Sequence, residues 1–207
     1  MNNTCIPILF ICHTNAKITK ISFEKIRSLT PKKLYVHFDG PRNDQEKKEI
    51  DKTINEINVD WECNLQIKKQ NKNHGIKYGP ILAINWFFNY EEMGVIIEYD
   101  VIISETFYSL CNKLLYRYKN NLDVYQISSA NFFEDKASNN TIAFNSWPHI
   151  WGWATWKRAW IKHQTKLKNF KEFKEDNKIN NFFNNKKAKK YVISKFENYN
   201  NGIDTSW

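Results

Sequence analysis

The chain has 207 residues and a formal net charge of +9. With 42% hydrophobic and 15% aromatic residues it can bury a sizeable core, which excludes global disorder, and its length suits one domain. No apolar stretch approaches a membrane span, and no basic segment precedes the first apolar run, so no signal peptide is predicted. The four cysteines follow no regular spacing, which argues against a disulfide framework or zinc ribbon. We expect a cytoplasmic protein.

The first 128 residues alternate between strand-like and helix-like segments. Strands are expected at 6–12, 34–38, 61–67, 95–98 and 124–128, and helices at 18–29, from Asn43/Asp44 to 57, from Pro80 to 88, and from Ser104 to 118. This order predicts an α/β fold, a mostly parallel twisted sheet with helices on both faces. Ligands of such sheets bind beyond the carboxyl ends of the strands.

Glu98-Tyr99-Asp100 follows a buried strand. Alternate side chains of a strand point to one face, so Glu98 and Asp100 aim together if the strand continues that far. Such a pair can hold Mg²⁺ or Mn²⁺, which in turn binds phosphate oxygens. The alternative is a pair of strand-end carboxylates that face water.

A second polar cluster, Asp39-Gly40-Pro41-Arg42, ends the second strand. It is either an ordinary tight turn or a site in which Asp39 accepts hydrogen bonds from a base or ribose and Arg42 pairs with phosphate. The segment Asn73-His74-Gly75 precedes the third helix, and Gly75 allows the backbone to approach a ligand there.

An aromatic block covers residues 147–160. It is either core or a platform for sugar rings. Trp153, Trp156 and Trp160 recur at helical spacing, which favours a buried stripe on a helix. His149 is either a ligand or a loop histidine.

The excess positive charge lies in the C-terminal part of the chain. Residues 1–149 hold 18 basic and 17 acidic side chains, whereas residues 150–207 hold 13 basic and 5 acidic ones. Composition bias alone can produce such a Lys/Asn-rich end. If the charge has a function, we expect it to face an anionic acceptor or membrane, with 157–195 contacting the inner face of the membrane peripherally. With four Arg in the chain, no nucleic-acid partner is expected.

Several motifs together resemble bacterial nucleotide-diphospho-sugar glycosyltransferases of the Rossmann-like glycosyltransferase A fold, in the group similar to N-acetylglucosaminyltransferase I. They occur in the expected order over about residues 5–160 and include Pro7–Phe10, Lys33–Arg42, Asn73-x-Gly75, Ala83–Phe88 and Gly94–Asp100; the most specific is Pro148-His149-Ile150-Trp151-Gly152-Trp153-Ala154-Thr155-Trp156.

The resemblance implies an inverting, metal-assisted transfer of a sugar from a UDP-linked donor to a hydroxyl of a glycan or lipid-linked acceptor, in surface polysaccharide assembly. Asp100 then matches the position that holds Mn²⁺ or Mg²⁺. Donor-binding positions are Asp39, Arg42, Asn73, Gly75, Glu98 and Tyr99, and acceptor-binding positions are His149, Trp151 and Trp153. By the same resemblance, residues 1–129 form the donor-binding part of a single domain over 1–207, and 130–207 the acceptor side.

Two departures from the family pattern give an alternative function. The first is Tyr99, which stands where the family has an acid. The second is length: the family continues beyond the point where this chain ends, so we expect either a chain truncated after Trp207 or a short member of the family. Asp204 is the candidate catalytic base. The alternative is a nucleotide-sugar-binding protein of the same fold with impaired catalysis.

Overall fold

A computed structural model describes residues 5–130, 142–175, 180 and 185–201. The chain divides into two compact units, 1–161 and 162–207. The first unit contains β1 (Ile8–Cys12), α1 (Ala16–Leu29), β2 (Lys33–Phe38), α2 (Asp44–Asn55), β3 (Asn64–Lys69), α3 (Gly75–Phe87), β4 (Met93–Glu98), α4 (Glu105–Arg117), β5 (Gln126–Ser128), β6 (Trp153–Trp156) and α5 (Lys157–Trp160). The second contains α6 (Phe170–Glu175) and α8 (Lys186–Asn200).

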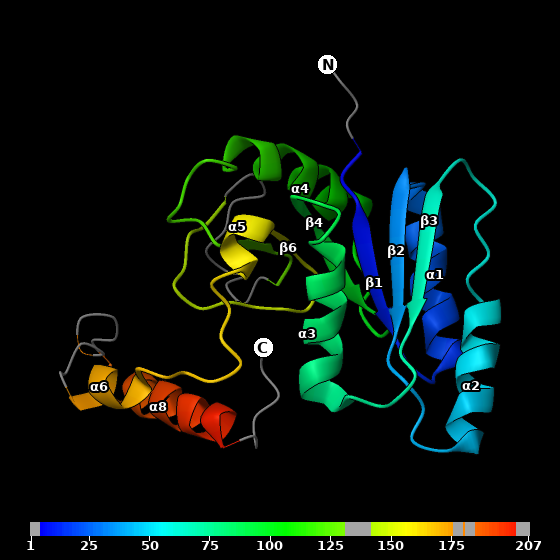
Figure 1. The fold of residues 1–207 in the computed structure, drawn as a ribbon. Coiled ribbons are helices and arrows are strands. Elements are labelled where there is room, and N and C mark those ends of the chain that lie inside the picture. Colours follow the sequence, from blue (N-terminus) through cyan, green and yellow to red (C-terminus); the bar gives the residue numbers. More distant parts are fainter. Residues whose placement is uncertain (1–4, 131–141, 176–179, 181–184, 202–207) are drawn as a thin grey trace. The chain divides into compact units, whose positions relative to one another are not determined.

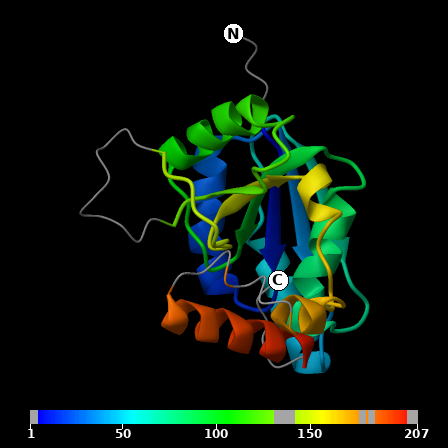
Figure 2. The same ribbon diagram turned by 90° about the vertical axis from the view of Figure 1, so that its left-hand side faces the viewer.

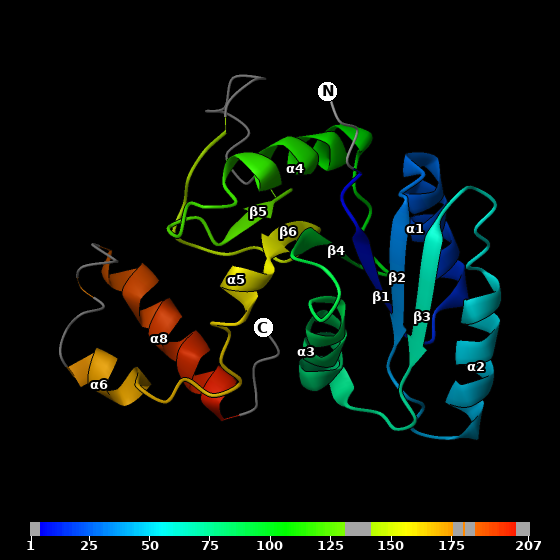
Figure 3. The same ribbon diagram turned by 45° about the horizontal axis from the view of Figure 1, so that its top comes forward.

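The first unit is an α/β fold around one mixed sheet, which confirms the predicted fold class (Figure 1). The strand order is β3-β2-β1-β4-β6-β5. The first four of these strands are parallel, and β6 runs antiparallel to both β4 and β5. Figure 3 shows β5 and β6 extending the sheet beyond β4.

Helices cover both faces of this sheet. Figure 2 shows α1 and α4 on one side of the strands and α3 and α5 on the other. The core on the α1 and α4 side gathers residues from α1, α2 and α4 and from five strands, among them Phe23, Val36, Ile97, Leu115 and Trp156. Continuous apolar strands are what a sheet covered on both faces requires, and β1 is buried along its whole length.

Local signals predicted the starts of α2 and α4. The side chains of Asn43 and Ser104 accept hydrogen bonds from the backbone N–H groups of Glu46 and Phe107, so both act as the expected N-caps. The prediction that Pro80 opens α3 is wrong, because the helix begins at Gly75 and Pro80 lies inside it.

The C-terminal strand of the sheet was not predicted. The expected helical stripe at Trp153, Trp156 and Trp160 is wrong, because residues 153–156 form β6 and only the last tryptophan belongs to a helix. All three side chains are nevertheless buried, as a core stripe requires. Over the described ranges, no helix combines the length and the apolar character needed to cross a membrane.

Candidate functional site

The carboxyl ends of β1, β2 and β4 form the edge at which the predicted site residues lie. The strand order reverses between β1 and β4, which makes this edge the switch point where open α/β sheets bind ligands. Register aligns His37 with Ile11 and Ile11 with Glu98. The three side chains share one face of the sheet, since aligned residues of neighbouring strands point the same way. It is the α3 face, because the His37 ring lies 6.3 Å from the Trp86 ring of α3.

Glu98 and Asp100 are brought together by a turn. The strand ends at Glu98, and the N–H of Val101 donates to the carbonyl of Glu98 at 2.9 Å. This four-residue turn, 98–101, differs from the extended strand that the sequence suggested. It still brings the carboxylates within electrostatic reach, because Asp100 contributes to the pKa of Glu98.

Two neighbouring elements fix the backbone of this turn at Tyr99. Its N–H donates to the carbonyl of Ile11 in β1 at 2.9 Å. Its carbonyl accepts a short hydrogen bond from the hydroxyl of Ser22, a buried residue of α1. The turn is therefore held from the sheet on one side and from α1 on the other.

Burial and a nearby like charge perturb the pKa of Glu98. Burial, together with the nearby charge of Asp100, raises the pKa of Glu98 to about 7. Asp100 itself is exposed. Within the described ranges neither carboxylate takes part in a hydrogen bond or ion pair, and no lysine or arginine there neutralises them.

These two carboxylates fit a hard divalent cation. Mg²⁺ and Mn²⁺ accept oxygen ligands, and Mg²⁺ is commonly held by one or two carboxylates, with water and substrate phosphates completing the shell. In the part of the chain that the structure describes, no group of three His, Cys, Asp or Glu side chains could hold a metal by itself. The pair suits a cation that arrives with a phosphorylated ligand better than a permanent structural metal.

Asp39 holds the start of α3. Its carboxylate accepts from the N–H groups of His74 at 3.0 Å and Gly75 at 2.9 Å, and from that of Gly40 at 2.9 Å. A carboxylate has roughly four acceptor positions, so these donors occupy most of them. Gly79 packs against the same group, since an added Cβ would lie 3.1 Å from Asp39 Oδ2. The predicted contact of Asp39 with a nucleotide base stays a prediction.

Asn73 joins the ends of two strands. Its Nδ2 donates to the carbonyl of Gly40 at 2.9 Å and lies 3.4 Å from Nε2 of His13. His13 carries no local signal in the sequence, although it directly follows β1 and lies at the switch point. Gly75 has a φ of 74°, a left-handed backbone that favours glycine at this position.

His37 is fully buried behind this edge. Its Nε2 lies 3.1 Å from the amide nitrogen of Gln70, and its Nδ1 has no hydrogen-bond partner in the described residues. Burial lowers the pKa of His37 to about 4; Asp39 opposes this shift, whereas Lys68 and His74 add to it. The ring is therefore neutral near pH 7.

Two predicted donor-binding residues have other contacts in the structure. The guanidinium of Arg42 is exposed and pairs with Glu46, the acid in the first turn of α2, at 2.7 Å from Nε. The Tyr99 side chain packs against the core on the α1 and α4 side, and burial raises its pKa. The structure thus brings neither side chain to Glu98 on the α3 face. Their roles toward a donor stay predictions.

The predicted acceptor residues differ in exposure. Trp151 is 63% exposed and can offer a flat face to a ligand, whereas Trp153 is 5% exposed. Trp153 packs in the core against Trp160, with ring centroids 6.4 Å apart. The backbone carbonyl of His149 accepts from Gln126 at 3.0 Å. Their contact with an acceptor remains untested, and the candidate base Asp204 lies outside the described residues.

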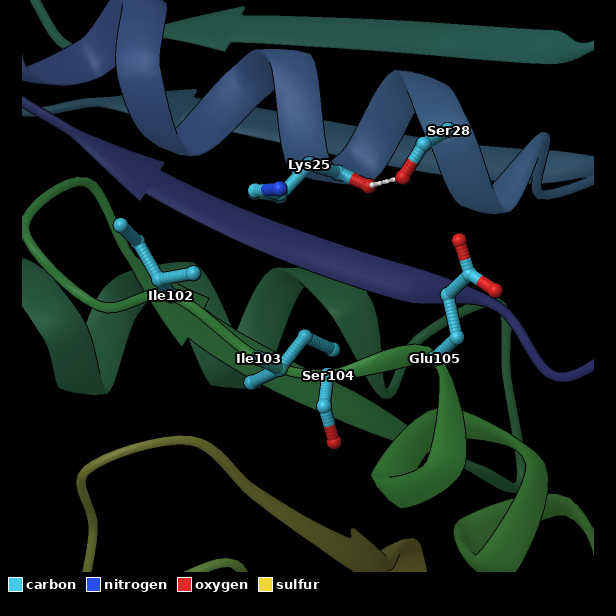
Figure 4. Close-up of a pocket in the computed structure, with 6 residues that line it drawn as sticks. All are labelled: Lys25, Ser28, Ile102, Ile103, Ser104 and Glu105. Atoms are coloured by element: carbon cyan, nitrogen blue, oxygen red, sulfur yellow. Dashed lines mark hydrogen bonds between the residues drawn. The ribbon is translucent and has the colours of Figure 1, made fainter.

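A surface hollow of about 470 Å³ lies on the other side of the sheet, between α1 and the start of α4 (Figure 4). It is lined by Lys25, Ser28, Ile102, Ile103, Ser104 and Glu105. The Ser28 hydroxyl donates a hydrogen bond to the carbonyl of Lys25 at 2.8 Å. None of the predicted site residues lines this hollow.

Comparison with known proteins gives a remote structural likeness. No protein family model and no curated protein matches the chain. One similar solved structure is the mannosyltransferase PcManGT from Pyrobaculum calidifontis in complex with GDP-Man and Mn²⁺, with a TM-score of 0.45 and 12% identity. The match covers 65% of this chain and 38% of that one, so this chain spans well under half of that protein's length. A likeness of this degree carries no argument about substrate or mechanism.

Proposed function

We propose that this protein is a glycosyltransferase that binds a nucleotide sugar at the carboxyl edge of β1, β2 and β4. The observation that carries the proposal is the turn 98–101, which holds two carboxylates without a described partner at the switch point of the sheet. Structural acids are normally paired or capped, as Asp39 and Glu46 are here. Two neighbouring acids without a described partner, one of them half-buried with a raised pKa, mark a candidate functional site, and a cation would neutralise them.

The proposed cation and the proposed nucleotide-sugar donor would bind at this edge together. A nucleoside diphosphate brings phosphate oxygens that complete the ligand shell of Mg²⁺ or Mn²⁺, while Asp100 and Glu98 contribute the protein's oxygens. A bound cation would offset the charge that develops on the departing diphosphate. Asn73 and Gly75 lie at the same edge, beside the start of α3, and Gly75 has no side chain to keep a ligand from the backbone there.

In the proposed reaction, an acceptor hydroxyl oxygen forms a bond to the anomeric carbon of the sugar as the bond from that carbon to the diphosphate oxygen breaks. The hydroxyl proton passes to a carboxylate base, and the nucleoside diphosphate leaves with the bonding electrons. Asp204 is the base that the sequence resemblance suggests. Trp151, which is 63% exposed, is the aromatic residue that we propose for contact with the acceptor.

Binding of nucleoside diphosphates tests the proposal. Calorimetric titration of UDP and of GDP, each with Mn²⁺ or Mg²⁺, should show metal-dependent binding by the intact chain. Asp100→Asn removes one charged ligand and should weaken that binding about 10-fold or more, because losing even a residue that only supports a metal ligand costs about 10- to 100-fold. Asp51→Asn is the matched control, because Asp51 is an exposed acid on α2. The proposal is wrong if no nucleoside diphosphate binds with either metal.

Release of product separates a transferase from a binder. Incubation with radiolabelled nucleotide sugars should liberate nucleoside diphosphate, by transfer or by slow hydrolysis. Metal-dependent binding without any release would favour the alternative function, a nucleotide-sugar-binding protein.

A further inference from the structure

The helix α8 carries an unusual concentration of positive charge. Four of its first five residues are lysines, and its first turn contains no acid. Among the described residues of the second unit there are ten lysines, three glutamates and no arginine. Five of these ten lysines lie on α8, so half of the positive charge described in this unit is carried by one helix.

One side of α8 packs within its own unit. Val192 and Tyr199 are buried, and the ring of Phe196 meets that of Phe170 in α6, with centroids 5.5 Å apart. The side chain of Asn200 is bonded to the backbone of Leu167 at both its oxygen and its nitrogen. The apolar side of the helix is therefore already occupied.

The other side of α8 presents lysines and a tyrosine to solvent. Lys186, Lys187, Lys190 and Tyr191 are all exposed, and their spacing places them on neighbouring turns of one face. Across the described ranges, none of these three lysines has an ion pair. Lys189 differs from them, because it bonds to Asn180. The ammonium of Lys195 lies 5.8 Å from the centre of the Tyr191 ring.

This arrangement of lysines destabilises α8. The N-terminus of a helix has a partial positive charge, so lysines in the first turn destabilise the helix and repel one another. Asn185 caps the end by accepting from Lys187 and Ala188, which satisfies backbone donors but adds no negative charge. A negatively charged surface opposite this face would remove the conflict.

We propose that the face formed by Lys186, Lys187, Lys190 and Tyr191 docks on a bilayer surface rich in anionic phospholipids. Lysine is a strongly hydrated point charge that suits a diffuse negative surface, whereas nucleic-acid recognition draws on the planar fork of arginine, which the described part of this unit lacks. Tyrosine is enriched at membrane–water interfaces, where its ring and hydroxyl meet both environments. The contact is peripheral, since Phe196 and Tyr199 on the apolar face of α8 pack within the second unit. It does not depend on the proposed sugar transfer.

Vesicle co-sedimentation of the intact chain tests this inference. The probes are vesicles of pure phosphatidylcholine and vesicles containing about one third phosphatidylglycerol. The triple variant Lys186→Glu/Lys187→Glu/Lys190→Glu should lose roughly 100-fold or more in affinity for the anionic vesicles, because each lysine near such a surface contributes about a factor of five. The acids fall at the helix N-terminus, where the dipole favours them, so the loss would not reflect an unfolded helix.

A matched control isolates position from total charge. Lys47→Glu/Lys48→Glu/Lys113→Glu changes the net charge equally at exposed residues of α2 and α4. This control should lose far less affinity than the α8 variant. Equal losses in both variants, or equal binding of wild type to both kinds of vesicle, would overturn the proposal. So would a preference for single-stranded RNA that anionic vesicles fail to compete away.

Discussion

His37 should make the stability of the protein depend on pH in a defined window. The side chain is fully buried on β2, and its pKa is lowered from 6.5 to about 4, mainly by burial. In the unfolded chain the imidazole takes up a proton near pH 6.5. Between these values the unfolded state binds more protons than the native state, so stability falls as the pH falls and is fully present above about 6.5.

The expected size of this effect follows from the two pKa values. A tenfold change in proton affinity corresponds to about 1.4 kcal/mol, so the difference between 6.5 and 4 corresponds to about 3 kcal/mol. Most of it, about 2–3 kcal/mol, should be lost by about pH 4.5. Losing that much removes a large part of the 5–15 kcal/mol typical of whole domains.

Urea unfolding at a series of pH values measures this contribution. His37→Gln keeps an amide that can bond to Gln70 but has no proton to gain, so the variant isolates the histidine. The wild type should be the more stable protein at pH 8, and its advantage should shrink by about 2–3 kcal/mol on going to pH 4.5. Parallel stability curves for the two proteins would refute the reasoning, because they would mean that His37 titrates alike in both states.

Two further substitutions test the supports of the site edge. Ser22→Ala removes the donor to the carbonyl of Tyr99 and should lower the free energy of unfolding by about 1–2 kcal/mol. The control Ser28→Ala, at an exposed position of the same helix, should lower it little. Equal effects of the two substitutions would contradict the anchoring of the turn. Gly94→Ala places a Cβ 2.3 Å from Cζ of Phe87 and should cost about 1–3 kcal/mol in thermal unfolding, and an unchanged melting temperature would contradict that close packing.

Short-range patterns predicted the parallel half of the sheet. Strands β1, β2 and β4 are apolar runs, and α2 and α4 begin at side-chain caps within three residues of the amides they satisfy. Such signals need no knowledge of the rest of the chain. The start of α3 could not be found this way, because Asp39, which accepts its first N–H groups, lies 35 residues away.

The tryptophan block shows a second limit of sequence patterns. A spacing of three between Trp153 and Trp156 fits one face of a helix, but in β6 the same spacing sends the side chains to opposite faces. Trp156 donates to the carbonyl of Leu115 in α4, and Trp160 donates to Asn85 in α3. Each of these helices thus accepts a hydrogen bond from one buried tryptophan. Which face of the sheet each tryptophan lies on is therefore set by tertiary packing and not by its spacing in the sequence.

The sequence placed Glu98 and Asp100 at the end of a buried strand, as the structure does, but not the backbone geometry that relates them. The pair Glu98 and Asp100 stood out because two acids followed an apolar run, but a turn rather than a continuing strand brings them together. The involvement of His13 with Asn73 was missed, since a single histidine after a strand carries no local signal. The capping role of Asp39 is likewise visible only once β2 and α3 are placed side by side.

Binding of Mn²⁺ at the turn 98–101 is the central claim, and electron paramagnetic resonance of free Mn²⁺ tests it most directly. Protein added to Mn²⁺ and a nucleoside diphosphate should reduce the free-ion signal beyond the reduction caused by the nucleotide alone. Asp100→Asn should abolish most of that further reduction, and Asp51→Asn should preserve it. An equal reduction by wild type and Asp100→Asn, or none by wild type, would contradict the assignment of this edge as a metal-assisted donor site.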